Sequence, residues 1–196
     1  MNSIRTISVY CASSDKINSI YFQAAKVLGE MLADRHIRVV NGAGSVGLMG
    51  ALSDSVLVKG GYVIGVIPHF MVEQGWQHIG LSELIEVGSM HERKQKIADM
   101  SDATIALPGG CGTLEELLEI ITWKQLGLYS HPVVILNING YFDPLLEMFH
   151  KAEQGNFMNS YPTLFQVVCS PSEAMDYLFN ISHFECAEEC LDIERR

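Results

Sequence analysis

Long hydrophobic runs are missing from this sequence of 196 residues. Its apolar stretches are as short as a strand, for example 133–136, whereas a membrane-spanning helix needs roughly 20 apolar residues. The first residues also lack the apolar run of a secretory signal. The five cysteines include no Cys-x-x-Cys spacing, which predicts neither a disulfide framework nor a structural zinc site. A cytoplasmic protein without a membrane partner is the simplest expectation.

Positive charge is scarce as well. Thirteen Lys and Arg residues stand against 23 Asp and Glu residues, and the resulting net charge of −10 repels nucleic acid at long range. The seven histidines show no His-x-x-His or His-x-x-x-His pairing, so no metal site is predicted. A Gly-x-Ser-x-Gly nucleophile motif is absent too. The remaining composition, 48% hydrophobic and 18% charged, is typical of a folded domain rather than a disordered chain or a coiled coil.

Strand-length apolar runs alternate with amphipathic stretches of helical length. Strands are predicted at 6–10, 38–40, 62–67, 104–107, 133–136 and 166–169. Helices are predicted at about 20–34, 48–59, 114–126 and 144–153, with two more starting at Ser89 and Pro171. The segment 68–88 has weak periodicity and is expected to be a loop or a lid.

This alternation predicts the α/β class, with a Rossmann-like doubly wound parallel sheet in a three-layer αβα arrangement. One domain is expected over 1–181, followed by a peripheral C-terminal helix or tail over 182–196. In such a sheet ligands bind beyond the carboxyl ends of the strands, and three of these ends are rich in small residues: 11–14, 42–47 and 108–113.

The second of these loops, 42–47, formally matches the Gly-x-Gly-x-x-Gly pattern. A dinucleotide fingerprint follows the first strand and needs an acidic residue at the end of the next strand. This loop follows the second predicted strand, and no acidic residue stands at 67–69. NAD binding is therefore not predicted, and tight packing of a helix on a strand is the simpler reason for the glycines.

The third loop, 108–113, leads into a helix and offers consecutive glycines. Backbone N–H groups at a helix N-terminus attract anions, so a phosphate is the natural ligand. An alternative is an ordinary capping box made by Thr113 and Glu116. Glu115 and Glu116 stand beside this anion site and have to point away from a phosphate, toward a sugar. The basic run 90–96 offers Arg93 as a phosphate clamp, or else it is a solvated helix face.

Four motifs in order resemble the Lonely Guy (LOG) family. Residues 108–116 (PGGCGTLEE) match its PGGxGTxxE signature, and 90–94 (MHERK) match its second signature. The stretches 47–50 (GLMG) and 11–14 (CASS) match two more, and 121–127 resembles the family's helix. The resemblance covers about residues 4–180. One departure is 41–44, where this chain has Asn-Gly-Ala-Gly instead of Tyr-Gly-Gly-Gly, and alanine adopts a positive φ less readily than glycine.

Proteins of this family are cytokinin riboside 5′-monophosphate phosphoribohydrolases, often labelled lysine decarboxylases. The resemblance implies hydrolysis of the N-glycosidic bond of a nucleoside 5′-monophosphate, AMP or an N6-substituted AMP, to free base and ribose 5-phosphate, with no cofactor and no metal. It implies that Arg93 and Glu116 are catalytic. The residues implied to bind substrate are Ser14, Gly44, Met90, Lys94, Gly109, Gly110, Gly112, Thr113 and Glu115. Among these, 109–113 would hold the phosphate and Glu115 the ribose hydroxyls.

Two functions remain open at this point: a nucleotide hydrolase, and a non-catalytic nucleotide-binding or sensing module on the same fold. The pair of Arg93 and Glu116 favours the enzyme, since a pure binder would not need it. Base preference is not predicted, because AMP and N6-substituted AMP share every phosphate and ribose contact. The resemblance also implies a homodimer or a higher homo-oligomer, and the predicted helix 114–126 has more apolar residues than one core-facing stripe requires.

Overall fold

The structure, a computed structural model, describes residues 4–158 and 163–179. Within these residues seven strands form one sheet in the order β4-β3-β2-β1-β5-β6-β7, and every neighbouring pair is parallel. The strands are β1 (Thr6–Tyr10), β2 (Arg38–Asn41), β3 (Val63–Pro68), β4 (Glu83–Val87), β5 (Ala103–Ala106), β6 (Val133–Leu136) and β7 (Gln166–Val168). The predicted parallel sheet is confirmed.

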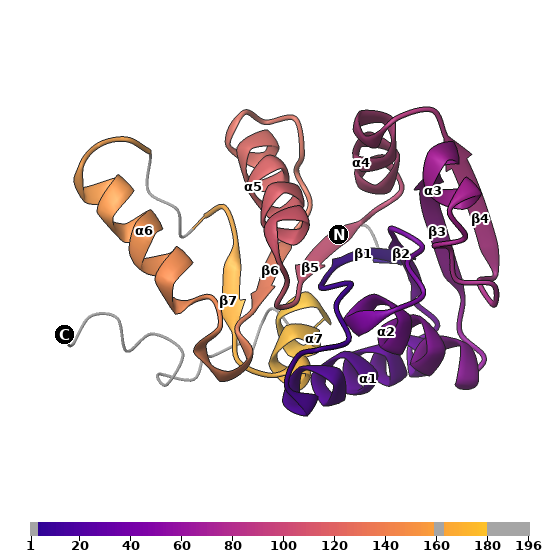
Figure 1. Cartoon of the computed structure of the whole chain (residues 1–196). Coiled ribbons are helices and arrows are strands. Elements are labelled where there is room, and N and C mark those ends of the chain that lie inside the picture. The colour runs from indigo at the N-terminus through magenta and orange to yellow at the C-terminus, as the bar shows by residue number, and fades with distance from the viewer. Residues whose placement is uncertain (1–3, 159–162, 180–196) are drawn as a thin grey trace.

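Helices cover both faces of this sheet (Figure 1). One face carries α1 (Ser19–Asp34), α2 (Gly47–Val58) and α7 (Pro171–Phe179), whose buried residues share one hydrophobic cluster with the strands. The other face carries α4 (Met90–Asp99), α5 (Cys111–Gln125) and α6 (Asp143–Gln154), which form a second cluster. The short helix α3 (His69–Glu73) and the 3-10 turn η1 (Ile138–Gly140) complete the fold. The three αβα layers are therefore as predicted.

Local sequence explains where these elements form. The side chain of Asn18 caps α1 by accepting a hydrogen bond from the Ile20 N–H at 3.0 Å. Apolar residues then recur at helical spacing on the buried face of α1, at Leu28 and Leu32 for example. All five residues of β1 are buried, as expected for a parallel strand covered by helices on both faces.

The segment 68–88 is more regular than the sequence pattern predicts. It contains α3 and the edge strand β4 instead of a loop or lid. Only Val87 of β4 is fully buried, because the strand lies at the border of the sheet and one face of it is open. A strand that buries so little carries a weak hydrophobic pattern, which explains why sequence periodicity missed it.

The strand order reverses at β1. From β1 the chain runs outward through β2 and β3 to β4, and then returns through α4 to place β5 on the other side of β1. The hydroxyls of Ser8 and Thr104 form a hydrogen bond of 2.8 Å between these central strands. Loops diverge where the strand order reverses, and the crevice between them is where ligands bind in open α/β sheets.

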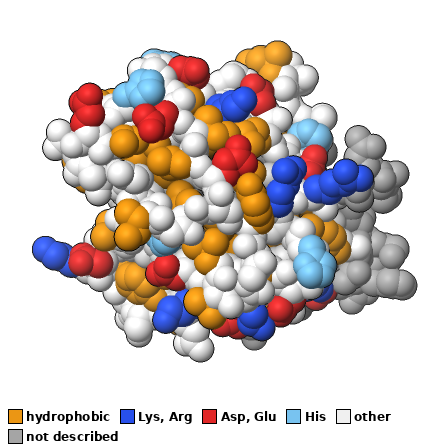
Figure 2. Space-filling view, turned by 90° about the vertical axis from the view of Figure 1, so that its right-hand side faces the viewer, with side chains coloured by type: hydrophobic (Ala, Val, Ile, Leu, Met, Phe, Trp, Pro, Cys, Tyr) orange, Lys and Arg blue, Asp and Glu red, His pale blue; other side chains and the backbone are white. Residues whose placement is uncertain are grey.

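Figure 2 looks onto the edge formed by α3 and β4, where hydrophobic side chains are scattered among charged ones. The exposed apolar residues of this segment are Phe70, Trp76, Ile79 and Leu84. The acidic residues Glu83 and Glu86 of β4 are exposed as well. Charged side chains on an edge strand hinder its pairing with a strand of another molecule.

Among the described residues, no helix is both long and apolar enough to cross a membrane. The last described element, α7, ends at Phe179. The expected helix or tail over 182–196 lies outside the described residues, so the division into a domain over 1–181 and a peripheral tail stays a prediction.

Candidate active site

The loops that follow β1, β2 and β5 meet at one backbone position, Ala12. Its N–H donates to the carbonyl of Pro108 at 3.1 Å, and its carbonyl accepts from the N–H groups of Leu48 and Met49 at 2.9 and 3.3 Å. Gly47 packs against the same loop with φ +68, and an added Cβ would lie only 2.7 Å from the Ala12 carbonyl oxygen. The three motif loops are therefore hydrogen-bonded and packed together at the carboxyl edge of the sheet.

The third loop enters α5 earlier than the sequence pattern predicts. The helix begins at Cys111 with Gly110 as its cap residue, three residues before the predicted start. Thr113 thus lies within the first turn, and its hydroxyl occupies the space where a side chain on residue 109 would be. The alternative of a capping box made by Thr113 and Glu116 is wrong, because Glu116 lies three residues beyond the third helical position.

The first turn of α5 presents an open helix N-terminus. Its N–H groups have no partner within the helix, and the helix dipole favours an anion there. An added Cβ on Gly110 or Gly112 would meet nothing within 4 Å, so packing within the protein does not require glycine at either position. The Tyr141 hydroxyl donates to the carbonyl of Gly109 at 2.7 Å and fixes the entry to the turn. This geometry suits a phosphate group.

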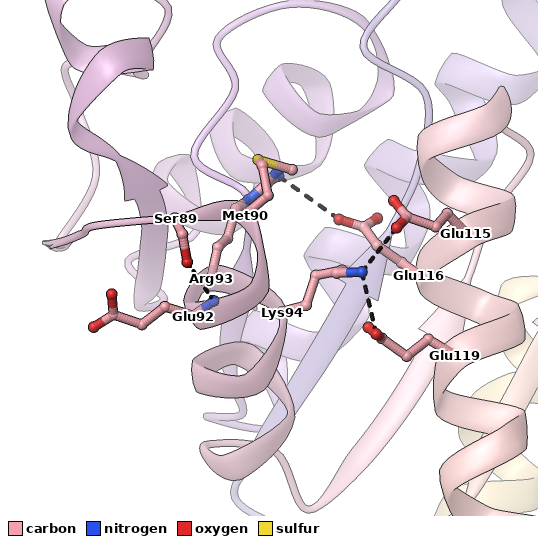
Figure 3. Close-up of polar contacts among 8 residues, drawn as sticks. All are labelled: Ser89, Met90, Glu92, Arg93, Lys94, Glu115, Glu116 and Glu119. Atoms are coloured by element: carbon pink, nitrogen blue, oxygen red, sulfur yellow. Dashed lines mark hydrogen bonds and ion pairs between the residues drawn. The ribbon is translucent and has the colours of Figure 1, made fainter.

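Helix α4 begins at the predicted cap residue. The hydroxyl of Ser89 accepts a hydrogen bond from the Glu92 N–H at 3.1 Å (Figure 3). The Glu92 carboxylate reaches back to the N–H of Gly88 at 2.8 Å, one residue further than in a standard capping box. Capped in this way, α4 directs Arg93 and Lys94 toward α5, and both are buried. A solvated helix face is therefore the wrong interpretation for these two residues.

Arg93 of α4 and Glu116 of α5 face each other (Figure 3). The distance from Nη2 of Arg93 to Oε1 of Glu116 is 3.8 Å, and the side chains are only 8% and 10% exposed. Nη1 of Arg93 contacts Sδ of Met90 at 3.7 Å, and its Nε is buried without a hydrogen-bond partner among the described residues. Because an unpaired buried donor is costly, this guanidinium is poised to donate to a ligand.

Burial raises the pKa of Glu116 from 4.5 to about 7. Removal from water is the largest cause, because it disfavours the charged carboxylate. Arg93 and Lys94 lower this pKa, whereas Glu115 and Glu119 on the same helix raise it. A carboxyl group with a pKa near 7 takes up and releases a proton readily at neutral pH, which suits general acid–base catalysis.

The end of β1 lies near the same carboxyl group. Burial, together with the charge of Glu116, raises the pKa of the Tyr10 hydroxyl and of the Cys11 thiol well above their ordinary values. Both groups therefore stay protonated and neutral at physiological pH. Neither supplies a competing base or a thiolate nucleophile beside Glu116.

Lys94 lies between two carboxylates of α5. Its Nζ is 2.8 Å from Oε1 of Glu115 and 3.1 Å from Oε1 of Glu119 (Figure 3). The hydrogen bond with Glu115 raises the pKa of Lys94, and Lys94 in turn lowers the pKa of Glu115. Lys94 is buried while Glu115 is exposed. Their expected contacts with substrate stay predictions, since here the two residues bind each other and join α4 to α5.

The other expected residues lie around this pair. Met90, the first residue of α4, is beside Arg93. Ser14 is exposed in the loop after β1 and accepts from the Lys16 N–H at 3.2 Å. Gly44 forms an isolated antiparallel bridge with Gln77, so the segment after α3 borders the second loop.

Sequence reasoning missed two contributors. Glu119 binds Lys94 one helical turn after Glu115, and its spacing of four residues from Glu115 is a signal that could have found it. Tyr141 comes from the turn after β6, and no local pattern links it to the loop of Gly109.

In residues 4–158 and 163–179, no group of three His, Cys, Asp or Glu side chains could hold a metal ion. The arrangement combines an anion site, a guanidinium with free donors and a carboxyl that titrates near neutrality.

Comparison with known proteins adds independent findings. A family model described as "Possible lysine decarboxylase" matches residues 49–178. The cytokinin riboside 5′-monophosphate phosphoribohydrolase LOG3 of Arabidopsis thaliana is 40% identical over 200 residues, covering 99% of this chain and 92% of the relative. The probable cytokinin riboside 5′-monophosphate phosphoribohydrolase LOGL1 of Oryza sativa subsp. japonica is 46% identical over 154 residues, covering 79% of this chain and 69% of the relative.

Solved structures share the fold at lower identity. The molybdenum cofactor binding protein from Rippkaea orientalis superposes with a TM-score of 0.70 and 20% identity, covering 93% of this chain and 100% of that one. The molybdenum cofactor carrier protein of Chlamydomonas reinhardtii gives the same TM-score and identity, covering 92% of this chain and 99% of that one. At this identity the likeness shows the fold alone.

Proposed function

The chain belongs to the Lonely Guy (LOG) family of phosphoribohydrolases, and from that premise we propose that it hydrolyses the N-glycosidic bond of a nucleoside 5′-monophosphate. The substrate is AMP or an N6-substituted, cytokinin-type AMP, and the products are free base and ribose 5-phosphate. The observation that carries this proposal is the buried pair of Arg93 and Glu116 beside the open N-terminus of α5. A protein that only binds nucleotides has no need of a buried carboxyl with a pKa near 7.

In the reaction, a water oxygen bonds to C1′ of the ribose while the bond from C1′ to the base nitrogen breaks. Positive charge develops on the sugar, and the carboxylate of Glu116 stabilises it, as carboxylates do in glycosidases. The same carboxylate accepts a proton from the attacking water, and its pKa of about 7 lets it release that proton afterwards. The departing base takes up one proton, so the hydroxyl group of the water ends on C1′ of the ribose and a proton ends on the base.

Arg93 stays positively charged at every physiological pH and cannot act as a base. Its free donors hold an anionic or hydroxyl group of the substrate and keep Glu116 in place. The phosphate binds at the N–H groups of 109–113, and Ser14, Gly44 and Met90 border the nucleotide. Lys94 holds Glu115 close to the site, where its carboxylate accepts hydrogen bonds from ribose hydroxyls.

The description of the family as possible lysine decarboxylases does not fit the chemistry of this site. Amino-acid decarboxylation of that kind uses pyridoxal phosphate on a lysine, which needs a neutral amine to form its Schiff base. Lys94 is the lysine beside Arg93 in the candidate site, and its hydrogen bond with Glu115 raises its pKa. A lysine held in its charged form by two carboxylates is a poor candidate for that role.

The decisive experiment measures release of base. Purified protein is incubated with AMP and with N6-prenylated AMP, and free base and ribose 5-phosphate are quantified separately. We expect equal molar amounts of the two products. Formation of nucleoside and inorganic phosphate would instead reveal a contaminating phosphatase. Saturable nucleotide binding without any base release would favour the non-catalytic nucleotide-binding or sensing module.

We also expect a homodimer or a larger homo-oligomer. Helix α5 and the turn after it expose Leu118, Leu126 and Leu128, which are 40%, 66% and 72% accessible in the single chain. Such apolar surface is usually covered by a partner. Light scattering at micromolar concentration should give at least twice the chain mass of 21.7 kDa, and Leu126→Glu should lower the measured mass. A single 21.7 kDa species would contradict this expectation. Its net charge of −10 disfavours nucleic-acid partners, and a cytoplasmic location without membrane partners stays a prediction.

A further inference from the structure

Gly42, the residue that follows β2, lies directly against the guanidinium of Arg93. A side chain added to Gly42 would overlap Nη2 of Arg93, and its Cβ would lie 2.7 Å from Cζ and 3.1 Å from Nε. Gly42 is buried, and its φ is outside the left-handed region. Backbone conformation therefore does not require glycine at position 42. Glycine is required there because the guanidinium of Arg93 occupies the space that a side chain would fill.

The loop around Gly42 is held on both sides. The buried amide of Asn41 donates to the hydroxyl of Ser53 at 3.1 Å, and its oxygen accepts from the Ala43 N–H at 2.9 Å. Ala43 adopts φ 62, the positive value that the sequence comparison at 41–44 had suggested. Its carbonyl accepts from the His78 N–H at 2.8 Å. These contacts of its two neighbours restrain the backbone of Gly42, so it has little freedom to shift when residue 42 gains a side chain.

Few polar contacts orient the Arg93 guanidinium. Its Nε has no hydrogen-bond partner among the described residues, and its contacts with Met90 and Glu116 measure 3.7 and 3.8 Å, long for strong bonds. Its direction is set mainly by packing. We propose that Gly42 is a positioning residue for the reaction, whose bare Cα leaves room for the Nη2 end of the Arg93 guanidinium beside the second loop, where Nη2 faces Glu116. This inference rests on the proposed function.

The test is Gly42→Ala. The three atoms nearest to the added methyl group all belong to the end of the long Arg93 side chain, which can turn to another rotamer, so the fold should tolerate the substitution, with a melting temperature within a few degrees of wild type. The guanidinium has to swing away from its position, and we expect kcat for AMP hydrolysis to fall about tenfold. Gly88→Ala is the matched control. Gly88 is exposed, and a methyl group there would meet only the Glu92 carboxylate, at 3.3 Å.

A double-mutant cycle with Arg93→Met separates positioning from a general structural role. A methionine side chain reaches only about as far as Nε of arginine, so it removes the Nη2 and Cζ atoms that lie nearest to the methyl group of Gly42→Ala. If Gly42 acts through Arg93, adding Gly42→Ala to Arg93→Met lowers kcat by less than about twofold. Independent, multiplicative effects of the two substitutions would overturn the proposal, and so would wild-type kcat in Gly42→Ala alone.

A second readout does not depend on turnover. Carboxyl NMR titration of Glu116 should show a higher pKa in Gly42→Ala than in wild type, because Arg93 is the largest influence that lowers it. The other charged groups facing Glu116, namely Lys94, Glu115 and Glu119, are untouched, and Tyr10 and Cys11 stay neutral. Gly88→Ala should leave this pKa unchanged. An unaltered Glu116 pKa in Gly42→Ala would refute the positioning role, whether or not the wild-type protein is active. Absence of hydrolysis by the wild-type protein would separately refute the proposed function.

Discussion

Glu116→Gln should lower kcat for nucleoside monophosphate hydrolysis by about 10³-fold while nucleotide binding is retained. Glutamine keeps the size and hydrogen-bonding oxygen of the side chain, but it carries no charge for the developing cation and is a poor base. The open N-terminus of α5, which lies a turn earlier, is unchanged. Steady-state kinetics on AMP and calorimetric binding of AMP check the two halves of this prediction.

The same substitution should not destabilise the protein at pH 8. The folded-state pKa of Glu116 is raised from 4.5 to about 7, so between these values the folded chain binds more protons than the unfolded chain. Wild-type stability therefore falls as pH rises through this window and stays lowered above it, by on the order of 3 kcal/mol at most. Glu116→Gln removes this dependence, and its melting temperature at pH 8 should equal or exceed that of wild type. Below about pH 4.5 Glu116 is protonated in both the folded and the unfolded chain, so this contribution to the stability difference between wild type and Glu116→Gln disappears.

Glu147→Gln is the matched control for both measurements. Glu147 is an exposed residue of α6, and it pairs with Lys151 at 2.7 Å on the surface. Water screens an exposed pair of this kind, so removing it should change the melting temperature little and leave kcat unaltered. If Glu116→Gln hydrolyses AMP at nearly the wild-type rate, Glu116 is not catalytic and the non-catalytic module becomes the better interpretation.

Adenosine should be hydrolysed at least about 10²-fold more slowly than AMP, measured as kcat/KM. A phosphate at the N–H groups of 109–113 makes charge-assisted hydrogen bonds worth about 3 kcal/mol, which corresponds to roughly two orders of magnitude in rate. Binding energy from this remote group helps to hold the sugar against Glu116, so part of the loss should appear in kcat.

Competition by product fragments provides the control for this prediction. Ribose 5-phosphate should inhibit AMP hydrolysis competitively at concentrations where ribose has no effect. The exposed glycines Gly110 and Gly112 leave the backbone open for this contact. Equal kcat/KM values for nucleoside and nucleotide would mean that the N-terminus of α5 is not a phosphate site.

Patterns confined to one element were predicted well. The buried strands, the amphipathic helices and the cap at Ser89 all depend on neighbours in the sequence, and the structure has them close to the predicted positions. Strand β4 was missed because an edge strand buries few residues. The start of α5 was misplaced because Gly110 and Gly112 have low helix propensity, whereas the connection from β5 sets where the helix begins.

Pairings between elements were beyond the reach of local patterns. The motif around Arg93 and the motif around Glu116 were both recognised in the sequence, but their facing geometry requires α4 and α5 to lie side by side. The two carboxylates that hold Lys94, and the packing of Gly42 under Arg93, depend on the same long-range arrangement. Such contacts are set by how the sheet orders its strands, which composition and periodicity do not encode.

The reversal of strand order at β1 also bears on how the protein folds. Strands β1 to β4 can associate in the order of synthesis, each beside its predecessor, whereas β5 has to return to β1, and Ser8 and Thr104 are 96 residues apart. Long-range closure of this kind is slow compared with local helix formation. Arg93 and Glu116 lie on the two helices that flank β5, so they come together only when this central pairing is complete. Recovery of catalysis during refolding thus reports on this long-range pairing of β5 with β1, which helix content alone does not register.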